Sequence, residues 1–185
     1  MSSPAAGHEP SAPRAVPRIG SLASLVGAHP DALSAIFATG RATDPAELGD
    51  TPRGRVLALT QGSEVFLVVR PVLRALSDAG FPWRAKTFDH GGNSGQDVVF
   101  GRRVFRFQAE RGPSQVDGLP ALVLTYDAPV HKNPWPVRAL RDELRTVGPG
   151  IAIGRAFFRT GGGGSGGSPG ATAVPFLWFG LEPGG

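Results

Sequence analysis

The sequence predicts a mainly β fold, in which about eight antiparallel strands close into a barrel and one or two short N-terminal helices precede them. Glycine (27) and proline (18) make up close to a quarter of the 185 residues, too many for a helical bundle and normal for short strands joined by turns. From Phe81 onward, apolar and polar residues alternate with a period of two in short segments. Closing such strands into a barrel removes the exposed edges of an open sheet. A β-sandwich is the main alternative.

The composition is typical of one soluble domain, with 41% hydrophobic and 18% charged residues. We expect residues 1–20, rich in proline, alanine and serine, to be a disordered tail, and residues 21–185 to form a single domain. The first eighteen residues lack the apolar stretch of a signal peptide, and no segment approaches the roughly 18 apolar residues of a membrane span. These features predict a cytoplasmic protein that does not use a membrane as a partner.

A short helix is predicted for residues 30–40. Leu33, Ile36 and Phe37 recur at helical spacing and share one face. Gly40 stands where a helix often ends in a C′ glycine. Turn-forming residues follow it up to the first strand.

Eight segments have the pattern of strands bounded by glycine, proline and aspartate turns. Alternation is clearest where Phe105, Phe107 and Ala109 share one face. The final strand is apolar on both faces, as expected where one face lines an interior and the other lies under a helix or loop. Residues 63–79 fit either a helix kinked at Pro71 or a strand followed by a helix from that proline. In order, the predicted strands are Gly54–Thr60, Trp83–Phe88, Gln96–Phe100, Arg103–Glu110, Ala121–Tyr126, Pro136–Val147, Ile151–Thr160 and Val174–Leu181.

The hairpin of residues 136–160 has the most informative pattern of polar residues. A three-residue turn at residues 148–150 gives it one polar outer face, with an ion pair expected between Glu143 and Arg155. Its other face is predicted to line a barrel interior with free volume. That inner face comprises Leu140, Asp142, Leu144, Ala152, Gly154, Ala156 and Phe158. The outer face comprises Arg141, Glu143, Arg145, Arg155 and Arg159.

Asp142 is the carboxylate on that inner face, and a carboxylate in an apolar interior must be paired or protonated. One interpretation pairs it with Arg138 and closes one end of the barrel. The other makes it a polar anchor for a mainly apolar ligand, or a general base with a raised pKa. Tyr126, which shares a face with Leu122 and Leu124, either donates a hydrogen bond to a carbonyl inside the cavity or is a core residue with its hydroxyl at the rim. Asp142 and Tyr126 are therefore the candidate catalytic residues.

Aromatic residues supply the predicted apolar walls. Trp135 lies between two prolines that restrict its backbone, so it is either a rim contact on a ligand or a packing plug. The complete set of ligand-binding candidates is Trp83, Lys86, Tyr126, Trp135, Arg138, Asp142, Phe158 and Trp178.

Neither a cofactor nor a metal is expected. Cysteine is absent, which excludes thiol catalysis, and the four histidines have no metal-ligand spacing. The glycine-rich tract 161–170 lacks the Gly-Lys-Ser/Thr ending of a phosphate-binding loop and leads into a strand, so it is predicted to be a flexible loop. The net charge is +4 and the arginines are scattered, which argues against a nucleic-acid partner.

Three segments carry a family resemblance. They are Trp83-Arg-Ala-Lys-Thr-Phe-Asp89, Asp117-Gly-Leu-Pro-Ala-Leu-Val-Leu-Thr-Tyr126, and Arg138 to Arg145 with Gly150-Ile-Ala-Ile-Gly154. Together they resemble uncharacterised bacterial calycin-like proteins, which are lipocalin-type barrels, and are similar to GXWXG/DUF4334-type domains. The likeness covers roughly residues 53–181. It implies a small barrel with a hydrophobic cavity and conveys no known reaction.

The leading functional expectation is a barrel that binds a small hydrophobic molecule, as a monomer or homodimer. The alternative is a cofactor-free isomerase or cyclase acting on a hydrophobic natural-product intermediate, with Asp142 as general acid and base and Tyr126 polarising a carbonyl. A third possibility is an interaction module that uses the arginine-rich outer face of the hairpin.

Overall fold

The computed structural model describes residues 19–60, 83–160 and 172–184. Most of the predicted tail, the ambiguous segment 63–79 and the glycine tract 161–170 lie outside these residues.

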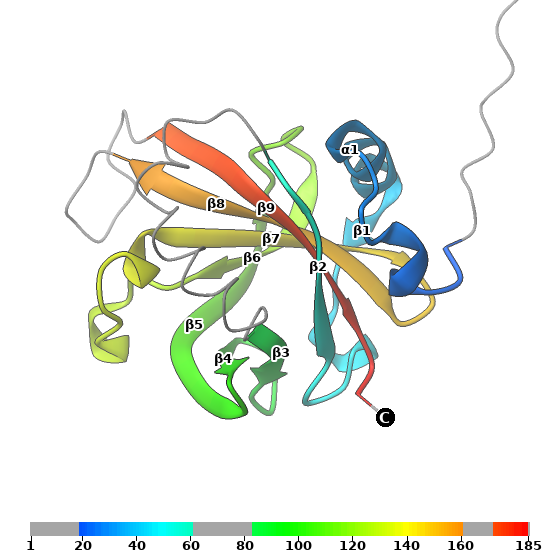
Figure 1. Cartoon of the computed structure of the whole chain (residues 1–185). Helices are drawn as coiled ribbons and strands as arrows, with labels where there is room; N and C mark the ends of the chain where they lie inside the picture. The colour runs from blue at the N-terminus through cyan, green and yellow to red at the C-terminus, as the bar shows by residue number, and fades with distance from the viewer. Residues whose placement is uncertain (1–18, 61–82, 161–171, 185) are drawn as a thin grey trace, which may run out of the picture.

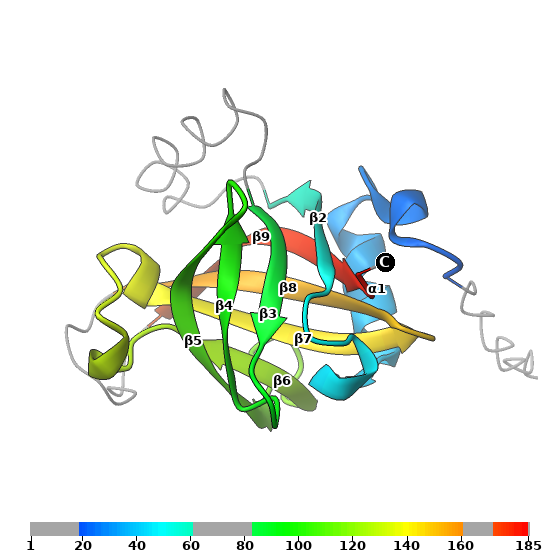
Figure 2. The same ribbon diagram turned by 90° about the horizontal axis from the view of Figure 1, so that it is seen from below.

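The described chain forms a closed antiparallel β-barrel with one α-helix, which confirms the predicted fold class and is consistent with a calycin-like barrel (Figure 1). Strands β2 to β9 pair in chain order, and the pairing of β9 with β2 closes the ring. In Figure 2, β3, β4 and β5 form one wall, and β7, β8 and β9 cross behind them. The strands are β1 (Arg41–Ala42), β2 (Arg53–Leu59), β3 (Trp83–Phe88), β4 (Ser94–Val99), β5 (Arg102–Pro113), β6 (Pro120–Thr125), β7 (Leu140–Gly148), β8 (Ile151–Thr160) and β9 (Thr172–Glu182).

The weakest seam of the barrel lies between β2 and β3. Only Arg53 and Ala85 pair as strand residues there. Beyond that pair, the backbone N–H of Phe88 donates to the carbonyl of Asp50 at 3.0 Å. By contrast, β8 and β9 pair along almost their full length, so the C-terminal strands form the most continuous part of the wall.

Helix α1 (Pro30–Thr39) packs on the outside of the barrel and buries Leu33, Ile36 and Phe37, as predicted. It lies with the short 3-10 helix η1 (Leu22–Leu25) over β7 and β9, and three further 3-10 turns occupy loops. Gly40 has an extended rather than a left-handed backbone, so it is not the expected C′ glycine. A Cβ there would lie 2.8 Å from the Cβ of Arg145, so the glycine allows the chain to approach β7 closely. The further 3-10 turns are η2 (Pro45–Glu47), η3 (Pro129–His131) and η4 (Val137–Ala139).

The β7–β8 hairpin has the predicted register in its body. Glu143 pairs with Arg155 and Arg145 pairs with Ile153. The turn differs, because Gly148, not Val147, pairs with Ile151, and a bulge absorbs the extra residue. The alternation of the two faces is therefore preserved without a three-residue turn.

Apolar side chains fill much of the barrel interior, and the hairpin's predicted inner face contributes to it. Leu144, Ala152, Ala156 and Phe158 all belong to this inner cluster. The free volume expected above the small residues is reduced, because a Cβ on Gly154 would lie 2.4 Å from the ring of Phe179. Phe179 from the neighbouring strand thus occupies the space above that glycine. The buried interior residues are Leu48, Phe88, Phe107, Ala109, Leu122, Leu124, Tyr126, Leu144, Ala152, Ala156, Phe158, Phe176, Leu177, Phe179 and Leu181.

The outer face of β7 is buried, so the expectation of an exposed arginine-rich interaction face is wrong. The Arg145 guanidinium is fully buried and donates to both carboxylate oxygens of Asp117, at 2.7 and 2.6 Å. Glu143 accepts hydrogen bonds from Arg141 Nε at 2.8 Å and Ser114 Oγ at 2.6 Å. Asp117 of the segment between β5 and β6 therefore neutralises Arg145, whereas Arg141 of β7 neutralises Glu143.

The expected Glu143–Arg155 ion pair is also replaced. Although these two residues face each other in the register, Glu143 is held by the partners just described. The Arg155 guanidinium instead lies 4.9 Å from the centroid of the Trp178 ring, in a cation–π contact.

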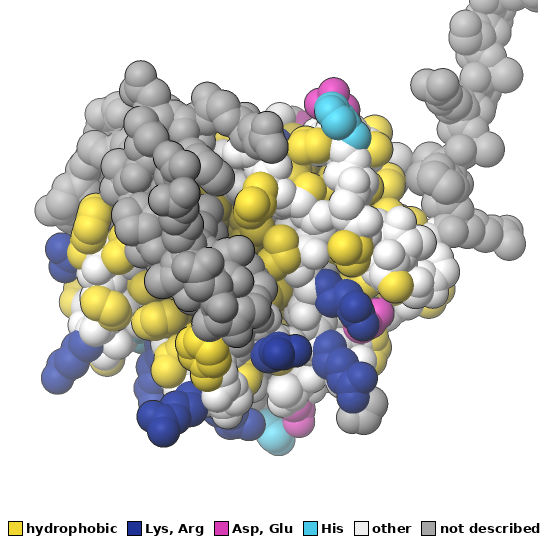
Figure 3. Space-filling view, viewed as in Figure 1, with side chains coloured by type: hydrophobic (Ala, Val, Ile, Leu, Met, Phe, Trp, Pro, Cys, Tyr) yellow, Lys and Arg dark blue, Asp and Glu magenta, His cyan; other side chains and the backbone are white. Residues whose placement is uncertain are grey.

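On the face shown in Figure 3, lysine and arginine side chains are spread along the lower part of the molecule, with other residue types between them. Among the described residues, no helix combines the length and the apolar character needed to cross a lipid bilayer.

Replacing Gly154 with alanine is expected to lower the free energy of unfolding by about 1–3 kcal/mol, because the added Cβ overlaps the Phe179 ring. Gly20→Ala is the matched control, since nothing lies within 4 Å of a Cβ at that position. Urea denaturation of both variants measures the difference. Equal stabilities would contradict the close packing of Phe179 on β8.

Candidate functional site

A buried lysine lies at the centre of a group of polar side chains inside the barrel. Lys86 lies in β3, with only 2% of its side chain exposed. A bulge between Trp83 and Ala85 shifts the alternation of β3. As a result, Trp83 and Lys86 both reach Asp97 on β4, from Nε1 at 3.0 Å and from Nζ at 2.7 Å.

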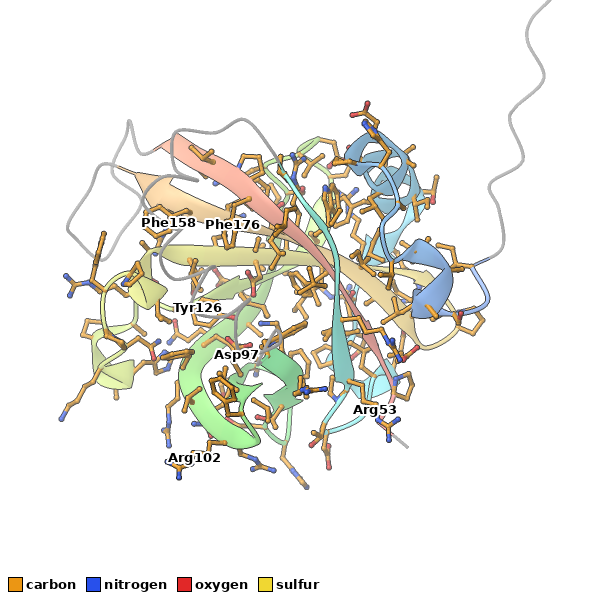
Figure 4. All side chains as sticks on the ribbon, viewed as in Figure 1. Arg53, Asp97, Arg102, Tyr126, Phe158 and Phe176 are labelled. Carbon is orange, nitrogen blue, oxygen red and sulfur yellow. The ribbon has the colours of Figure 1, made fainter. Side chains whose placement is uncertain are left out.

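All three N–H bonds of the Lys86 ammonium group have partners. Nζ donates to Asp97 Oδ1 at 2.7 Å, to Tyr126 Oη at 2.7 Å and to Asp142 Oδ2 at 2.8 Å. Tyr126 Oη in turn donates to Asp142 Oδ2 at 2.9 Å. Asp97 and Tyr126 lie close together within the ring of strands (Figure 4). We refer to Lys86, Asp97, Tyr126 and Asp142 as the lysine cluster.

The lysine cluster joins two walls of the barrel. Lys86 and Asp97 come from the adjacent strands β3 and β4, whereas Asp142 comes from β7 and Tyr126 directly follows β6. Because β5 lies between these two strand pairs, no backbone hydrogen bond links them directly. The side chains therefore make a polar connection across the interior.

Aromatic rings surround the ammonium group. Its Nζ lies between 5.2 and 5.5 Å from the centroids of four rings. The electron-rich ring faces favour a positive charge at this place, more strongly when water is excluded. These rings belong to Trp83, Phe107, Tyr126 and Phe179.

Burial and neighbouring charge shift the titration of the lysine cluster. Burial, together with repulsion from Asp97, raises the pKa of Asp142 in spite of the nearby Lys86 charge. For Lys86, burial acts to lower the pKa, but Asp142 and Asp97 together outweigh it, and the pKa is raised. Burial and the same carboxylates raise the pKa of Tyr126 well above its ordinary value. At neutral pH Lys86 is therefore charged, Tyr126 is neutral, and Asp142 is the group poised to take up a proton.

Two carboxylate oxygens of the lysine cluster remain free of partners among the described residues. Oδ1 of Asp97 and Oδ2 of Asp142 accept all the hydrogen bonds given above. The other oxygen of each carboxylate accepts none from the described part of the chain. The two side chains keep 9% and 8% of their surface exposed, against 2% for Lys86. Within the described residues the cluster therefore has spare acceptors, whereas the donors of Lys86 and Tyr126 are used.

The structure brings together four of the residues proposed from the sequence: Trp83, Lys86, Tyr126 and Asp142. Phe158 also lies in the interior, and its ring meets that of Trp135 edge-on with centroids 6.4 Å apart. Trp135 is 60% exposed and therefore stands at the surface beside the interior.

Two proposed residues lie elsewhere. Arg138 is exposed in the turn η4 before β7 begins, so it does not pair with Asp142, whose cation is Lys86. Trp178 points outward and packs edge-on against Phe37 of α1, with ring centroids 5.7 Å apart. The prediction that Trp178 forms part of the interior wall is wrong, because the alternation of β9 points its side chain towards helix α1.

Sequence reasoning missed Asp97. Its signal was an acidic residue between Gln96 and two valines in a short strand, a pattern that does not by itself place the acid inside. A bulge between Gln96 and Asp97 in the pairing with β5 further blurs the alternation. Within the described ranges, no group of three or more His, Cys, Asp or Glu side chains could hold a metal ion.

The fold and site define a closed antiparallel barrel protein with a buried lysine cluster in its interior. The chain matches no protein-family model and no curated protein. It is similar to the crystal structure of a protein from Thermomonospora curvata, with a TM-score of 0.51 and 13% sequence identity, over 88% of this chain and 93% of that one. At this identity the likeness concerns the fold alone.

Replacing Lys86 with methionine is expected to lower the free energy of unfolding by about 3–5 kcal/mol at neutral pH, because two buried carboxylates lose their cation. Lys132→Met, at the exposed lysine of the chain, is the matched control. Without the Lys86 charge the pKa of Asp142 rises further, so the variant should be relatively most stable in acid and lose stability as pH rises. Chemical denaturation across pH measures this. A loss no larger than that of Lys132→Met would contradict the role of the ion pairs.

Proposed function

We propose that the protein binds a small, largely hydrophobic molecule in the interior of the barrel, with the lysine cluster as its polar anchor. The observation that carries this proposal is the burial of one ammonium and two carboxylate groups in an otherwise apolar interior. The resemblance to calycin-like barrels points in the same direction.

The energetic cost of the lysine cluster supports a functional role. Each buried charge loses its hydration, and well-packed apolar residues of similar volume are often as stabilising or more so. A barrel that needed only a core would fill these positions with residues such as its own Leu122, Leu124 and Leu144. Shifted pKa values together with specific charge partners are typical of sites that recognise or transform a ligand.

The surroundings of the lysine cluster suit a mainly apolar ligand. The rings of Phe107 and Phe179 lie within 5.4 Å of Lys86 Nζ, centroid to atom. Phe158 and the exposed Trp135 continue the aromatic surface towards the outside. A ligand would thus meet rings along its body and a hydrogen-bonding group at one end.

Binding can be tested with Nile red, a neutral lipophilic dye whose fluorescence rises in apolar surroundings. We expect saturable binding of one dye per protein. Ala156→Leu should bind about tenfold more weakly, because Ala156 pairs with Asp142 and the larger isobutyl side chain of leucine fills the interior beside it. Ala38→Leu, on the exposed side of α1, is the control. Circular dichroism checks that both variants are folded. No saturable binding, or equal binding by both variants, would count against the proposal.

A second candidate function is a cofactor-free isomerase or cyclase. It is favoured by the 2.9 Å hydrogen bond between Tyr126 Oη and Asp142 Oδ2, and by burial that raises the pKa of this carboxyl. In an isomerisation, Tyr126 would turn its hydroxyl hydrogen from Asp142 to the carbonyl oxygen of the substrate. Asp142, released from this hydrogen bond, would take a proton from the carbon next to that carbonyl and return it to another carbon. Atoms and electrons balance within the substrate, so no oxidant or reductant is needed.

The catalytic candidate predicts that Asp142→Asn binds the ligand but loses at least about 100-fold in turnover, because asparagine cannot accept the proton. The ligand extracted from the purified protein is returned to it in deuterium oxide, and mass spectrometry follows deuterium uptake and isomer formation. Asp127→Asn, at a surface ion pair with Arg159, is the control. Undiminished turnover by Asp142→Asn would dismiss catalysis by this residue and leave the binding proposal intact.

A further inference from the structure

We propose that the ligand carries a protonated amine, and that this amine binds to the carboxylate oxygens of Asp97 and Asp142 that have no partner among the described residues. The inference deepens the proposed binding function and rests on it. It names the ligand class as a small hydrophobic amine, in contrast to a hydrophobic acid or alcohol.

The hydrogen-bond inventory of the lysine cluster supports a donor on the ligand. The three Lys86 donors, the Tyr126 hydroxyl and the Trp83 indole N–H already have partners. The spare groups among the described residues are acceptors, one oxygen on each carboxylate. A ligand acid or carbonyl would have to displace an existing hydrogen bond, whereas an ammonium group supplies new donors.

The charge of the lysine cluster favours a cation over a neutral donor. One ammonium group is opposed by two carboxylates, so the cluster carries a net negative charge when both are ionised. Both carboxyl side chains are more than nine-tenths buried, at 9% and 8% exposed, so this charge is poorly solvated. A ligand ammonium would balance the cluster at two positive and two negative charges. A ligand carboxylate would add to the excess.

The aromatic rings that line the site are also suited to a positively charged ligand. The rings of Trp83, Phe107 and Phe179 lie around the position of the Lys86 charge. Aromatic faces stabilise ammonium groups at close range and also pack against an apolar body. One set of side chains therefore serves both parts of a hydrophobic amine.

Without a ligand, a proton can take the place of the cation. Among the described residues, the titratable groups facing Asp142 are Lys86, Tyr126 and, through Lys86, Asp97, whereas β5, β8 and β9 contribute apolar residues including Phe107 and Phe179. Burial and Asp97 raise the pKa of Asp142, so it binds a proton more readily than an exposed carboxyl does. Amine binding should release that proton, and the affinity for the amine should rise with pH until Asp142 is fully ionised.

The decisive experiment compares three probes with the same ring system: 1-naphthylmethylamine, 1-naphthalenemethanol and 1-naphthoate. Titration calorimetry of the full chain at neutral pH measures their affinities. We expect the amine to bind at least about tenfold more tightly than the alcohol, and the acid to bind most weakly. The amine should also bind more tightly as pH rises from mildly acidic to neutral, whereas the alcohol should change less.

Asp142→Asn and Asp97→Asn test the two carboxylates without a large change in shape. Each should reduce the preference for the amine over the alcohol to about threefold or less, while leaving alcohol binding in place. Asp50→Asn, at an exposed aspartate, should keep the full preference. If a cluster variant fails to fold, the ranking of the three probes and its pH dependence in the wild-type protein still decide the question.

The outcomes separate the two levels of the proposal. Amine-selective binding that depends on both carboxylates supports it. Equal or tighter binding of the alcohol or the acid overturns the amine assignment, while the barrel remains a hydrophobic-ligand binder. Failure of Nile red and of all three naphthyl probes to bind overturns the binding function itself, and the amine assignment with it.

Discussion

The charge of Lys86 is the constraint on which the interior of this barrel depends. Its ammonium group donates hydrogen bonds to two carboxylates and a phenol. These groups are too deeply buried for water to solvate them fully. Through its hydrogen bonds, the lysine side chain links strands that are not neighbours in the sheet. Alternative registers of β3 would turn this charge outward or leave Asp142 unpaired inside, at a cost of several kcal/mol.

Strand β7 has buried charged side chains with oppositely charged partners on both of its faces. Inside the barrel, Asp142 is neutralised by a lysine from β3. Outside, Arg145 is neutralised by Asp117 in the segment that connects β5 to β6, and Glu143 is neutralised by Arg141 of β7 and accepts a hydrogen bond from Ser114. Both faces of this strand therefore carry buried charges. Asp142 and Arg145 are paired with groups far away in the sequence, whereas Glu143 pairs with Arg141 on the same strand. Such pairing gives less free energy than apolar packing but specifies one arrangement of the strands.

The two faces differ in what they leave unused. Outside β7, the Glu143 carboxylate is engaged by three neighbouring groups, and the Arg145 guanidinium is shared between a carboxylate and backbone carbonyls. Inside, the lysine cluster keeps acceptor oxygens with no partner among the described residues and retains a little exposure. In a purely structural ion pair, all hydrogen-bonding groups are expected to have partners. A site that recognises a ligand needs donors or acceptors that are still unpaired. This difference is the physical reason why we propose ligand binding in the interior rather than on the outer face.

The sequence by itself determined most of the strand segments, the helix at residues 30–40, the register in the body of the β7–β8 hairpin, and the inward direction of Asp142. The predicted strand Pro136–Val147 begins too early, because residues 137–139 form the turn η4 and β7 starts at Leu140. These features follow from local alternation and turn chemistry, which act over a few residues. Only the tertiary structure decided that Lys86 and not Arg138 pairs with Asp142, that Asp97 completes the lysine cluster, and that Trp178 faces α1. Bulges in β3, β5 and β9 change which face a side chain occupies, and closure of the barrel sets which strands meet across it. Both depend on contacts between residues distant in the chain, which a local pattern does not encode.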